Sequence, residues 1–301
     1  MPSIVKLIKN PAKIVYILDR LGISRWIPDK PYLKLKFRAN MGKKLNLENP
    51  QTFNEKLQWL KLYDRKMEYT TMVDKYEAKH YVAEKIGEEY IIPTLGIWNS
   101  AEDIEFDYLP QQFVLKCTHD SGGLVICREK AALNRVSAIK KIKKCLKRNF
   151  FYTAREWPYK NIHPRIIMEQ FLEDGSGQDL MDYKVMCFGG QPKLIQIHRG
   201  RSANHTQDYY DINWNKLDIC QGIAQTDIPM KKPEFLEEML RLSSKLSAGV
   251  PQLRVDWYYV NRHLYFGELT FFDGGGFFGF KPEEWDYTLG TWIELPSTNK
   301  C

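Results

Sequence analysis

Two acidic residues near the C-terminus lie in strand-like runs and could hold a metal ion. The stretch RVDWYYVNRHLYFGELTFFDGGG begins at Arg254 and places Asp256 and Glu268 in two runs rich in aromatic and β-branched residues. We expect these runs to form a β-hairpin with its turn centred at Arg262. In that register Asp256 lies opposite Glu268, and Arg254 lies opposite Thr270. Because side chains alternate between the faces of a strand, all four would share one face.

Facing carboxylates repel one another unless a cation neutralises them. No His or Cys lies beside Asp256 or Glu268, apart from His263 at the turn. Oxygen ligands of this kind favour Mg²⁺ or Mn²⁺, and two carboxylates with several waters are a usual way to hold Mg²⁺ beside substrate phosphates. A register slipped by one residue would turn the acids to different sides, and the hairpin alone leaves both registers open.

A second stretch could bind the phosphates that such a metal would accompany. In FVLKCTHDSGG an apolar strand ends near Lys116, and Ser121, Gly122 and Gly123 follow in a loop. Backbone N–H groups in a glycine loop can approach phosphate oxygens closely. A Gly-Gly hairpin turn with an incidental lysine is the alternative. Further along, IIMEQFLED ends a strand at Glu169, with Glu173 and Asp174 after it.

Helices and strands alternate along the rest of the chain. Thr52 and Glu55 form a capping box that should open a helix, and a second helix should run from Thr71 to Gly87. Further helices are expected over 134–150 and 233–249, strands over 90–98, 112–127 and 164–174, and hairpins over 180–201 and 254–276, followed by a polar tail. The first of these hairpins should turn at Gly189 and Gly190. This order favours an α+β fold with mixed or antiparallel sheets.

Composition restricts the function classes. The 301 residues include 44 basic and 37 acidic side chains, for a net charge of +7, which could suit nucleic acid, an anionic membrane or an anionic substrate. No nucleic-acid-binding signature accompanies the charge, so we expect no nucleic acid partner. The six cysteines show no CxxC spacing, and no run is apolar enough for a transmembrane helix or a signal peptide. We therefore expect a cytoplasmic protein.

The N-terminal region combines apolar and basic residues. Ile4, Leu7, Ile8, Ile14, Val15, Ile17 and Leu18 recur at roughly helical spacing, interrupted by Pro11. We favour a helix packed on its own domain. The alternative is an interfacial helix that gives the protein peripheral contact with the inner face of the membrane.

The sequence resembles the TupA-like ATP-grasp family, named after teichuronopeptide biosynthesis, over nearly its whole length. The blocks that carry the resemblance are NPQTFNEKLQWLKLYDR, DKYEAKHYVAEKIGEEYIIPTLGIW, LPQQFVLKCTHDSGG, REWPYKNIHPRIIMEQFLED, DYKVMCFGGQPKLIQ and RVDWYYVNRHLYFGELTF. The resemblance implies an ATP-grasp fold: two α+β lobes with mostly antiparallel sheets that clasp a nucleotide, plus a helical N-terminal region. The expected divisions are 1–70, mainly helical; 71–168, the first lobe with the glycine-loop lid; and 169–301, the C-terminal lobe with the metal site.

The resemblance also implies roles for individual residues. ATP would be bound by the following set: Lys75 and Lys116 as the nucleotide lysines, Ser121, Gly122 and Gly123 as the lid loop, Glu169, Gln170, Phe171 and Leu172 as the hinge beside adenine, Glu173 or Asp174 at the ribose, and Lys184 at a phosphate. Asp256 and Glu268 match the two acidic metal ligands. Thr270 stands where the family pattern ExN has Asn, which puts a second metal site in doubt.

The implied reaction joins a carboxylate to an amine through an acyl phosphate, at the expense of ATP. Arg254 would steady the transferred group, while Arg199 and Arg201 would bind the acidic substrate. A solvated basic strand end is the alternative for this last pair. Family members belong to polysaccharide gene clusters, so the expected partners are ATP, a sugar acid or glycan, and an amino acid or amine.

The sequence offers three alternative functions. A glycosyltransferase of polysaccharide biosynthesis is the main alternative, although the chain has no D-x-D motif and Glu105-Phe106-Asp107 is its nearest match. A dinucleotide-binding module is suggested by Gly274, Gly276 and Gly279, which formally match GxGxxG, but the chain ends too soon after them for a βαβ unit. Nucleic acid binding rests on charge alone.

Overall fold

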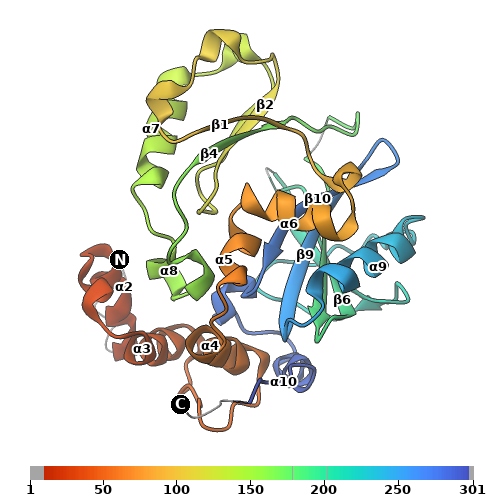
Figure 1. The fold of residues 1–301 in the computed structure, drawn as a ribbon. Coiled ribbons are helices and arrows are strands. Elements are labelled where there is room, and N and C mark those ends of the chain that lie inside the picture. The colour runs from red at the N-terminus through yellow and green to blue at the C-terminus, as the bar shows by residue number, and fades with distance from the viewer. Residues whose placement is uncertain (1–9, 178, 202, 298–301) are drawn as a thin grey trace.

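The protein contains two antiparallel sheets with helices packed around them (Figure 1). The computed structural model describes residues 10–177, 179–201 and 203–297. The smaller sheet has the strand order β1-β4-β2-β3, and the larger one has the order β10-β9-β5-β6-β7-β8. This architecture confirms the α+β class with antiparallel sheets.

The smaller sheet contains four strands and carries its own hydrophobic core. Its strands are β1 (Thr94–Trp98), β2 (Phe113–Cys117), β3 (Val125–Cys127) and β4 (Ile166–Gln170). The basic helix α7 (Arg135–Leu146) packs on β2 through Ala138, Ile142 and Cys145. The sheet ends at Gln170, whereas the sequence placed the end of the first lobe at residue 168.

The larger sheet has a different chemical character on each face. Its strands are β5 (Asp182–Phe188), β6 (Gln191–Arg199), β7 (Thr206–Asp211), β8 (Lys216–Leu217), β9 (Gln252–Val260) and β10 (His263–Thr270). Helix α9 (Leu236–Ser247) covers the face that carries Val185, Ile195 and Trp257. The opposite face carries Lys184, which pairs with Asp256 on β9 and with Gln196 on β6. The larger sheet therefore buries apolar side chains on the face covered by α9 and carries polar side chains on its other face.

The remaining α-helices pack in the hydrophobic core of the larger sheet. They are α2 (Ile14–Arg20), α3 (Asp29–Met41), α4 (Phe53–Tyr63), α5 (Glu68–Val73), α6 (Glu77–Ile86), the single turn α8 (Phe151–Ala154) and α10 (Glu284–Thr291). The short 3-10 helices are η1 (Pro11–Lys13), η2 (Ile23–Trp26), η3 (Glu88–Tyr90), η4 (Ala101–Asp103), η5 (Phe106–Tyr108), η6 (Lys130–Ala132), η7 (Trp157–Tyr159) and η8 (Asp273–Gly276). Helices α5 and α6 pack on β10 and α9, although the sequence assigned residues 71–86 to the first lobe.

Several local predictions are confirmed. The Thr52 hydroxyl accepts from the Glu55 backbone N–H, and the Glu55 carboxylate accepts from the Thr52 N–H, which completes the capping box of α4. Gly189 and Gly190 both have positive φ and form the turn between β5 and β6. Gly87 terminates α6.

Other local predictions are wrong. A single helix from Thr71 to Gly87 does not form, because Asp74 adopts an extended conformation and its carboxylate accepts from the Tyr76 and Glu77 N–H groups, which starts a new helix. Strand β7 was not expected at all. The tail after the last hairpin is not simply polar, since α10 buries Leu289 and its Asp286 accepts from the Asn54 N–H.

The N-terminal prediction is tested only in part. Ile4, Leu7 and Ile8 lie outside the described residues, while Val15 on α2 is buried and Ile14 is exposed. Among the described residues, none belongs to a helix with the length and apolar character needed to cross a bilayer.

Candidate active site between the two sheets

Two adjoining cavities lie between the sheets. Their volumes are about 390 Å³ and 210 Å³. They share a boundary formed by five residues: Lys116, Leu124, Asp182, Arg201 and Tyr258. The larger cavity is lined mainly by the smaller sheet and the smaller cavity by the larger sheet, so one elongated ligand could occupy both.

The larger cavity has apolar walls and a polar end. Ile92, Val114, Leu124 and Ile126 line it together with the segment Gln170–Leu172 that leaves β4. The Gln170 N–H already donates to the Pro93 carbonyl at 3.0 Å, so this group of the edge predicted for adenine is engaged within the protein. An apolar slot with a few backbone polar groups suits a flat aromatic base.

Glu169 anchors two lysines at the border of the cavities. Its carboxylate pairs with Lys79 at 2.7 Å and also with Lys116. Burial opposes its ionisation, but attraction to Lys116 and Lys79 prevails and lowers the pKa of Glu169 to about 2. Burial likewise opposes the charge of Lys116, yet Glu169 raises the pKa of this lysine above its usual value. Lys116 therefore stays charged and is held where a phosphate would extend from a base in the larger cavity.

The predicted glycine loop lines the smaller cavity. Ser121 and Gly123 line this cavity together with Lys75, whose Nζ donates to the Asp120 carbonyl at 3.0 Å. The Asp120 carboxylate accepts from the Gly122 N–H at 3.1 Å and pairs with Arg148 on the other side. The loop is thus held in a defined turn by an internal carboxylate.

The hairpin that was predicted to bind a metal forms with the predicted pairing of its acids. Glu268 lies opposite Asp256 and Thr270 lies opposite Arg254. The prediction of the turn itself was wrong, because the turn is Asn261–Arg262, with both φ angles positive, and Val260 pairs with His263. A β-bulge between Phe266 and Glu268 then shifts the register by one residue and brings the two acids together.

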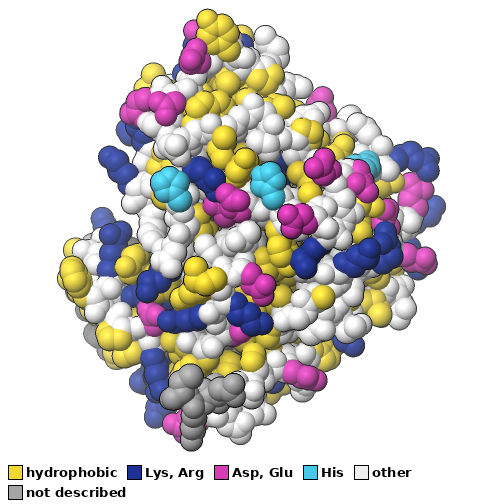
Figure 2. Space-filling model, in the orientation of Figure 1, with side chains coloured by type: hydrophobic (Ala, Val, Ile, Leu, Met, Phe, Trp, Pro, Cys, Tyr) yellow, Lys and Arg dark blue, Asp and Glu magenta, His cyan; other side chains and the backbone are white. Residues whose placement is uncertain are grey.

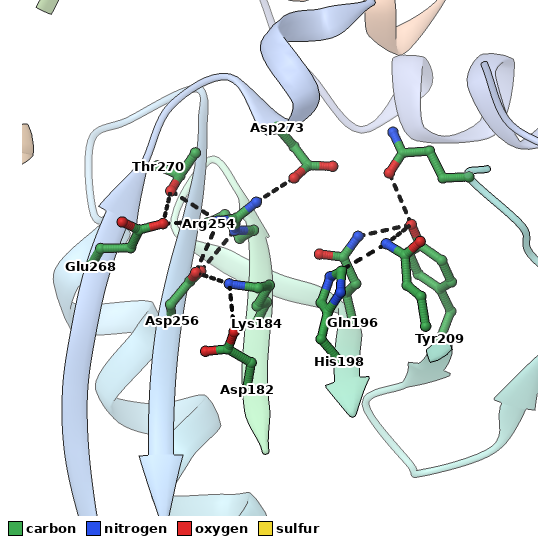
Figure 3. A network of polar contacts seen from close by, with 12 residues as sticks. Asp182, Lys184, Gln196, His198, Tyr209, Arg254, Asp256, Glu268, Thr270 and Asp273 are labelled. Carbon is green, nitrogen blue, oxygen red and sulfur yellow. Dashed lines mark hydrogen bonds and ion pairs between the residues drawn. The ribbon is translucent and has the colours of Figure 1, made fainter. Parts of the chain in front are cut away.

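Arg254 connects the side chains on this face (Figure 3). Its Nε donates to Asp256 at 2.7 Å and its Nη2 donates to Asp256 at 2.8 Å, to Glu268 at 3.2 Å and to Thr270 at 3.1 Å. Its Nη1 donates to Asp273. Burial disfavours the charge, but Asp256 and Asp273 hold the pKa of Arg254 well above its usual value. Arg254 is therefore a permanently charged group at the centre of the site.

The acids fit a magnesium ion in number and chemistry. Asp256 and Glu268 both line the smaller cavity, and one or two carboxylates with substrate phosphates are a usual Mg²⁺ ligand set. Among the described residues, no group of three or more His, Cys, Asp or Glu side chains is arranged to hold a metal ion. Both Asp256 carboxylate oxygens accept hydrogen bonds: Oδ1 from Arg254, and Oδ2 from Arg254 and Lys184. The Thr270 hydroxyl accepts from Arg254 and donates to Glu268. Glu268, with 39% of its side chain exposed, is the more open ligand.

A cluster of neutral polar side chains continues the same face across β6 and β7. The Tyr209 hydroxyl accepts from Gln196 at 2.9 Å and Gln207 at 3.0 Å, and it donates to Gln221 at 3.0 Å. Burial and the charge of Lys184 lower the pKa of the neighbouring His198 to about 2, so its ring is neutral. Gln196 Oε1, Gln207 Oε1 and Gln221 Nε2 have no hydrogen-bond partner among the described residues.

The other predicted residues separate into two groups. Lys184 pairs with Asp256, and Arg201 lines both cavities and pairs with Asp182. Arg199 lies on the opposite face of β6, where it pairs with the buried Asp208, so the structure does not bring it into the site. Glu173 is exposed on the loop after β4 and is not part of either cavity lining.

Sequence reasoning missed several residues of the site, including three charged ones. Lys79 shares Glu169 with Lys116, Asp182 lines both cavities, and Asp273 holds Arg254 from the loop after β10. Asp182 could have been found, since it precedes Lys184 by two residues and must share its face. The other two depend on contacts between distant segments, and nothing in the local pattern indicates them.

Solved structures with some similarity include ligases. D-alanine–D-alanine ligase from Bacillus anthracis complexed with ATP is 14% identical, with a TM-score of 0.40, over 66% of this chain and 53% of that chain. The enzyme of the same name from Helicobacter pylori is 15% identical, with a TM-score of 0.43, over 80% of this chain and 69% of that chain. A biotin carboxylase complex from Campylobacter jejuni is 14% identical, with a TM-score of 0.40, over 75% of this chain and 48% of that chain. This chain thus spans about half the length of the first and third.

The family of this chain is shown by a sequence match and not by these distant structures. The comparison with curated proteins found no match. The family model described as TupA-like ATPgrasp matches residues 55–294, a range that includes both sheets and every residue of the two cavities. The chain therefore belongs to the TupA-like ATP-grasp family.

Proposed function

We propose that this protein is an ATP- and Mg²⁺-dependent carboxylate–amine ligase that works through an acyl phosphate. The substrates would be a sugar acid, such as a uronic acid in a capsular, O-antigen or exopolysaccharide, and an amino acid or amine. Membership of the ATP-grasp family supports the use of ATP. The observation that carries the reaction class is the paired Asp256 and Glu268 beside Arg254 and Lys184, in a cavity continuous with the Lys116 pocket.

ATP would extend from the larger cavity into the smaller one. Its base would contact Phe171 and Leu172, and Lys116 would bind phosphate oxygens at the border. Backbone groups of the loop at Ser121 and Gly123 would cover the terminal phosphates. Mg²⁺ held by Asp256 and Glu268 would neutralise charge on these phosphates.

In the first step a carboxylate oxygen of the acid attacks the γ-phosphorus, and the bond between that phosphorus and the ADP oxygen breaks. The product is an acyl phosphate. Negative charge on the transferred group would be met by Arg254, which is buried and permanently charged, and by Lys184. Fixed cations in a buried site cost no reorganisation when the charge develops.

In the second step the amine lone pair attacks the acyl carbon, the bond to phosphate breaks, and phosphate leaves with a proton lost from the nitrogen. Arg201, with about half of its side chain exposed at the mouth of both cavities, would hold the departing phosphate or the acid.

The polar cluster on β6 and β7 supports the sheet beside the acids. Gln196, Gln207, Tyr209 and Gln221 are all buried, and none of them lines either cavity. Their hydrogen bonds to one another therefore hold neighbouring strands together beside the site.

Calorimetric titration of ATP tests the nucleotide site. Binding should require Mg²⁺ or Mn²⁺ and should weaken in Lys116→Ala and Glu268→Gln. Lys193→Ala, on an exposed position of β6, is the matched control and should bind as the native protein does. ADP release would then be screened with uronic acids and amines together, since either alone should support little turnover.

Nucleotide sugars provide the contrary outcome. Tight binding of a nucleotide sugar without any binding of ATP would overturn the ligase proposal in favour of glycosyl transfer. Release of free sugar from a nucleotide sugar in the absence of ATP would lead to the same conclusion.

A further inference from the structure

Three large apolar side chains project from the turn that follows α2. Leu21, Ile23 and Trp26 are 65%, 47% and 89% exposed. We call these three residues the apolar tip. Gly22 adopts φ +73° between them, which ends α2 and starts the 3-10 turn η2. A tryptophan this exposed is unusual, because burial of its ring gains more free energy than burial of almost any other side chain.

The apolar tip is held rigidly by the body of the protein. Ser24 is buried within the turn, and its carbonyl accepts from Arg155 Nη2 at 2.6 Å. Arg155 is itself buried, packs over the Tyr32 ring at 4.1 Å and pairs with Asp29 at 3.1 Å. The exposure of the tip is therefore a property of an ordered turn and does not arise from a loose loop.

The segment that carries the apolar tip is rich in basic side chains. Arg20, Arg25 and Lys30 are exposed on the same short segment. Residues 10–44 contain nine Lys or Arg and two Asp, an excess of seven, which equals the net charge of +7 of the whole chain. Both acids are neutralised internally: Asp19 pairs with Lys36, and Asp29 with Arg65 and Arg155. No unpaired carboxylate opposes an anionic partner there.

We propose that the apolar tip and the basic side chains on the same segment, Arg20, Arg25 and Lys30, bind the surface of an anionic membrane. Exposed Trp and Leu beside Lys and Arg combine the two signals that peripheral attachment requires, apolar insertion and attraction to anionic lipid. Figure 2 shows hydrophobic and basic side chains together at the edge where Figure 1 places α2. This surface lies outside both cavities, so the proposal is independent of the reaction.

Helix α7 is the other strongly basic surface, and its chemistry differs. Its Lys143 pairs with Glu102 and its Arg135 pairs with Asp107. Val136 is its large exposed apolar residue, at 79%, and no exposed aromatic ring accompanies it on the helix. Helix α7 therefore provides charge without the means to enter a lipid interface.

Sedimentation of the full chain with vesicles tests the proposal. The native protein should bind vesicles of phosphatidylglycerol and phosphatidylcholine in equal parts, and should bind pure phosphatidylcholine far less. Arg20→Gln with Lys30→Gln should weaken binding roughly 25-fold, at about fivefold for each charge. Leu21→Ser, Ile23→Ser and Trp26→Ser together should weaken it at least about tenfold even at low salt.

A matched control lies on another surface. Ile228 is 71% exposed and lies near the exposed Lys231 and Lys232. Ile228→Ser with Lys231→Gln and Lys232→Gln removes the same kinds of groups and should leave binding within about twofold of native. Brominated lipid should quench part of the tryptophan fluorescence of the native protein, and Trp26→Phe should bind equally while losing that part.

Three results would overturn the proposal. The first is that the triple serine variant binds vesicles as well as the native protein does. The second is that vesicle binding is lost only when Lys140 and Lys144 of α7 are changed to Gln. The third is that removal of residues 2–9 abolishes vesicle binding while the variants of the apolar tip still bind. Circular dichroism should be unchanged in every substitution variant, since each substituted side chain is exposed.

Discussion

Asp256 and Glu268 lie directly opposite one another across β9 and β10, and a single guanidinium group, that of Arg254, donates hydrogen bonds to both. The repulsion expected between facing carboxylates is therefore offset within the protein. The two acids nevertheless differ in environment, because Asp256 is almost fully buried and 39% of the Glu268 side chain is exposed. Because of this difference, we expect the two acids to contribute differently to the stability of the fold.

We expect Glu268→Gln and Asp256→Asn both to reduce ADP release about a hundredfold or more, because each removes a ligand for the metal and its phosphates. Only Asp256→Asn should also lower the free energy of unfolding, by about 3 kcal/mol, since it removes the buried carboxylate that pairs with both Lys184 and Arg254. Glu268→Gln should cost less than about 1 kcal/mol. Urea unfolding followed by circular dichroism, beside a coupled ADP assay, measures both. Full activity in either variant would remove that acid from the proposed metal site.

Gly267 should be essential for the pairing of the acids. It lies at the bulge, and a Cβ there would come within 3.1 Å of the Asp256 carbonyl oxygen and of the Tyr258 ring. Gly267→Ala should therefore lower the free energy of unfolding by about 1–3 kcal/mol and weaken Mg²⁺-dependent ATP binding. Gly279→Ala is the control, because its nearest neighbour would be Met41 Cε at 3.6 Å. Equal effects of the two substitutions would contradict a specific role for the bulge.

The hairpin shows how far sequence reasoning could reach. Alternation of side chains predicted the correct partners for Asp256 and Glu268, but the turn was misplaced by one residue and the bulge restored the register. The signal for the bulge was present, since an isolated glycine within a strand pattern often marks one. The predicted pairing was thus correct, although the reasoning behind it lacked the bulge.

Other parts of the site could not be derived from local pattern. Lys184 pairs with Asp256 because β5 and β9, distant in sequence, are neighbours in the sheet. Strand β7 was missed because the side chains on its inner face, Gln207 and Tyr209, are polar, so the apolar alternation that indicates a strand is weak there. Asp74 broke a helix that periodicity predicted as continuous, because its carboxylate caps the following helix.

The predicted glycine loop should tolerate a side chain at Gly122 better than at Gly123. A Cβ at Gly123 would meet Cys117 Sγ at 2.6 Å and Cys145 Cβ at 3.1 Å, both within the packed core of the smaller sheet. At Gly122 the nearest atom would be Arg148 Nη2 at 2.6 Å, the far end of a flexible side chain. Gly123→Ala should therefore weaken ATP binding by about tenfold or more, and Gly122→Ala by less, as measured by calorimetry. A stronger effect at Gly122 would mean that its backbone contacts phosphate directly.

Glu169 should make the stability of the protein depend on acid pH. Its pKa is about 2 in the folded protein against 4.5 in the unfolded chain, so the unfolded state binds more protons between these values. The contribution, about 3 kcal/mol, is fully present above pH 4.5 and is lost as the pH falls through 2. Glu169→Gln should therefore be less stable than the native protein at pH 7, and the difference should shrink between pH 5 and pH 2. Urea unfolding at several pH values measures this difference, with Glu237→Gln on the exposed side of α9 as a control that should follow the native protein throughout. A difference that stays constant with pH would show that Glu169 is not held ionised by Lys79 and Lys116.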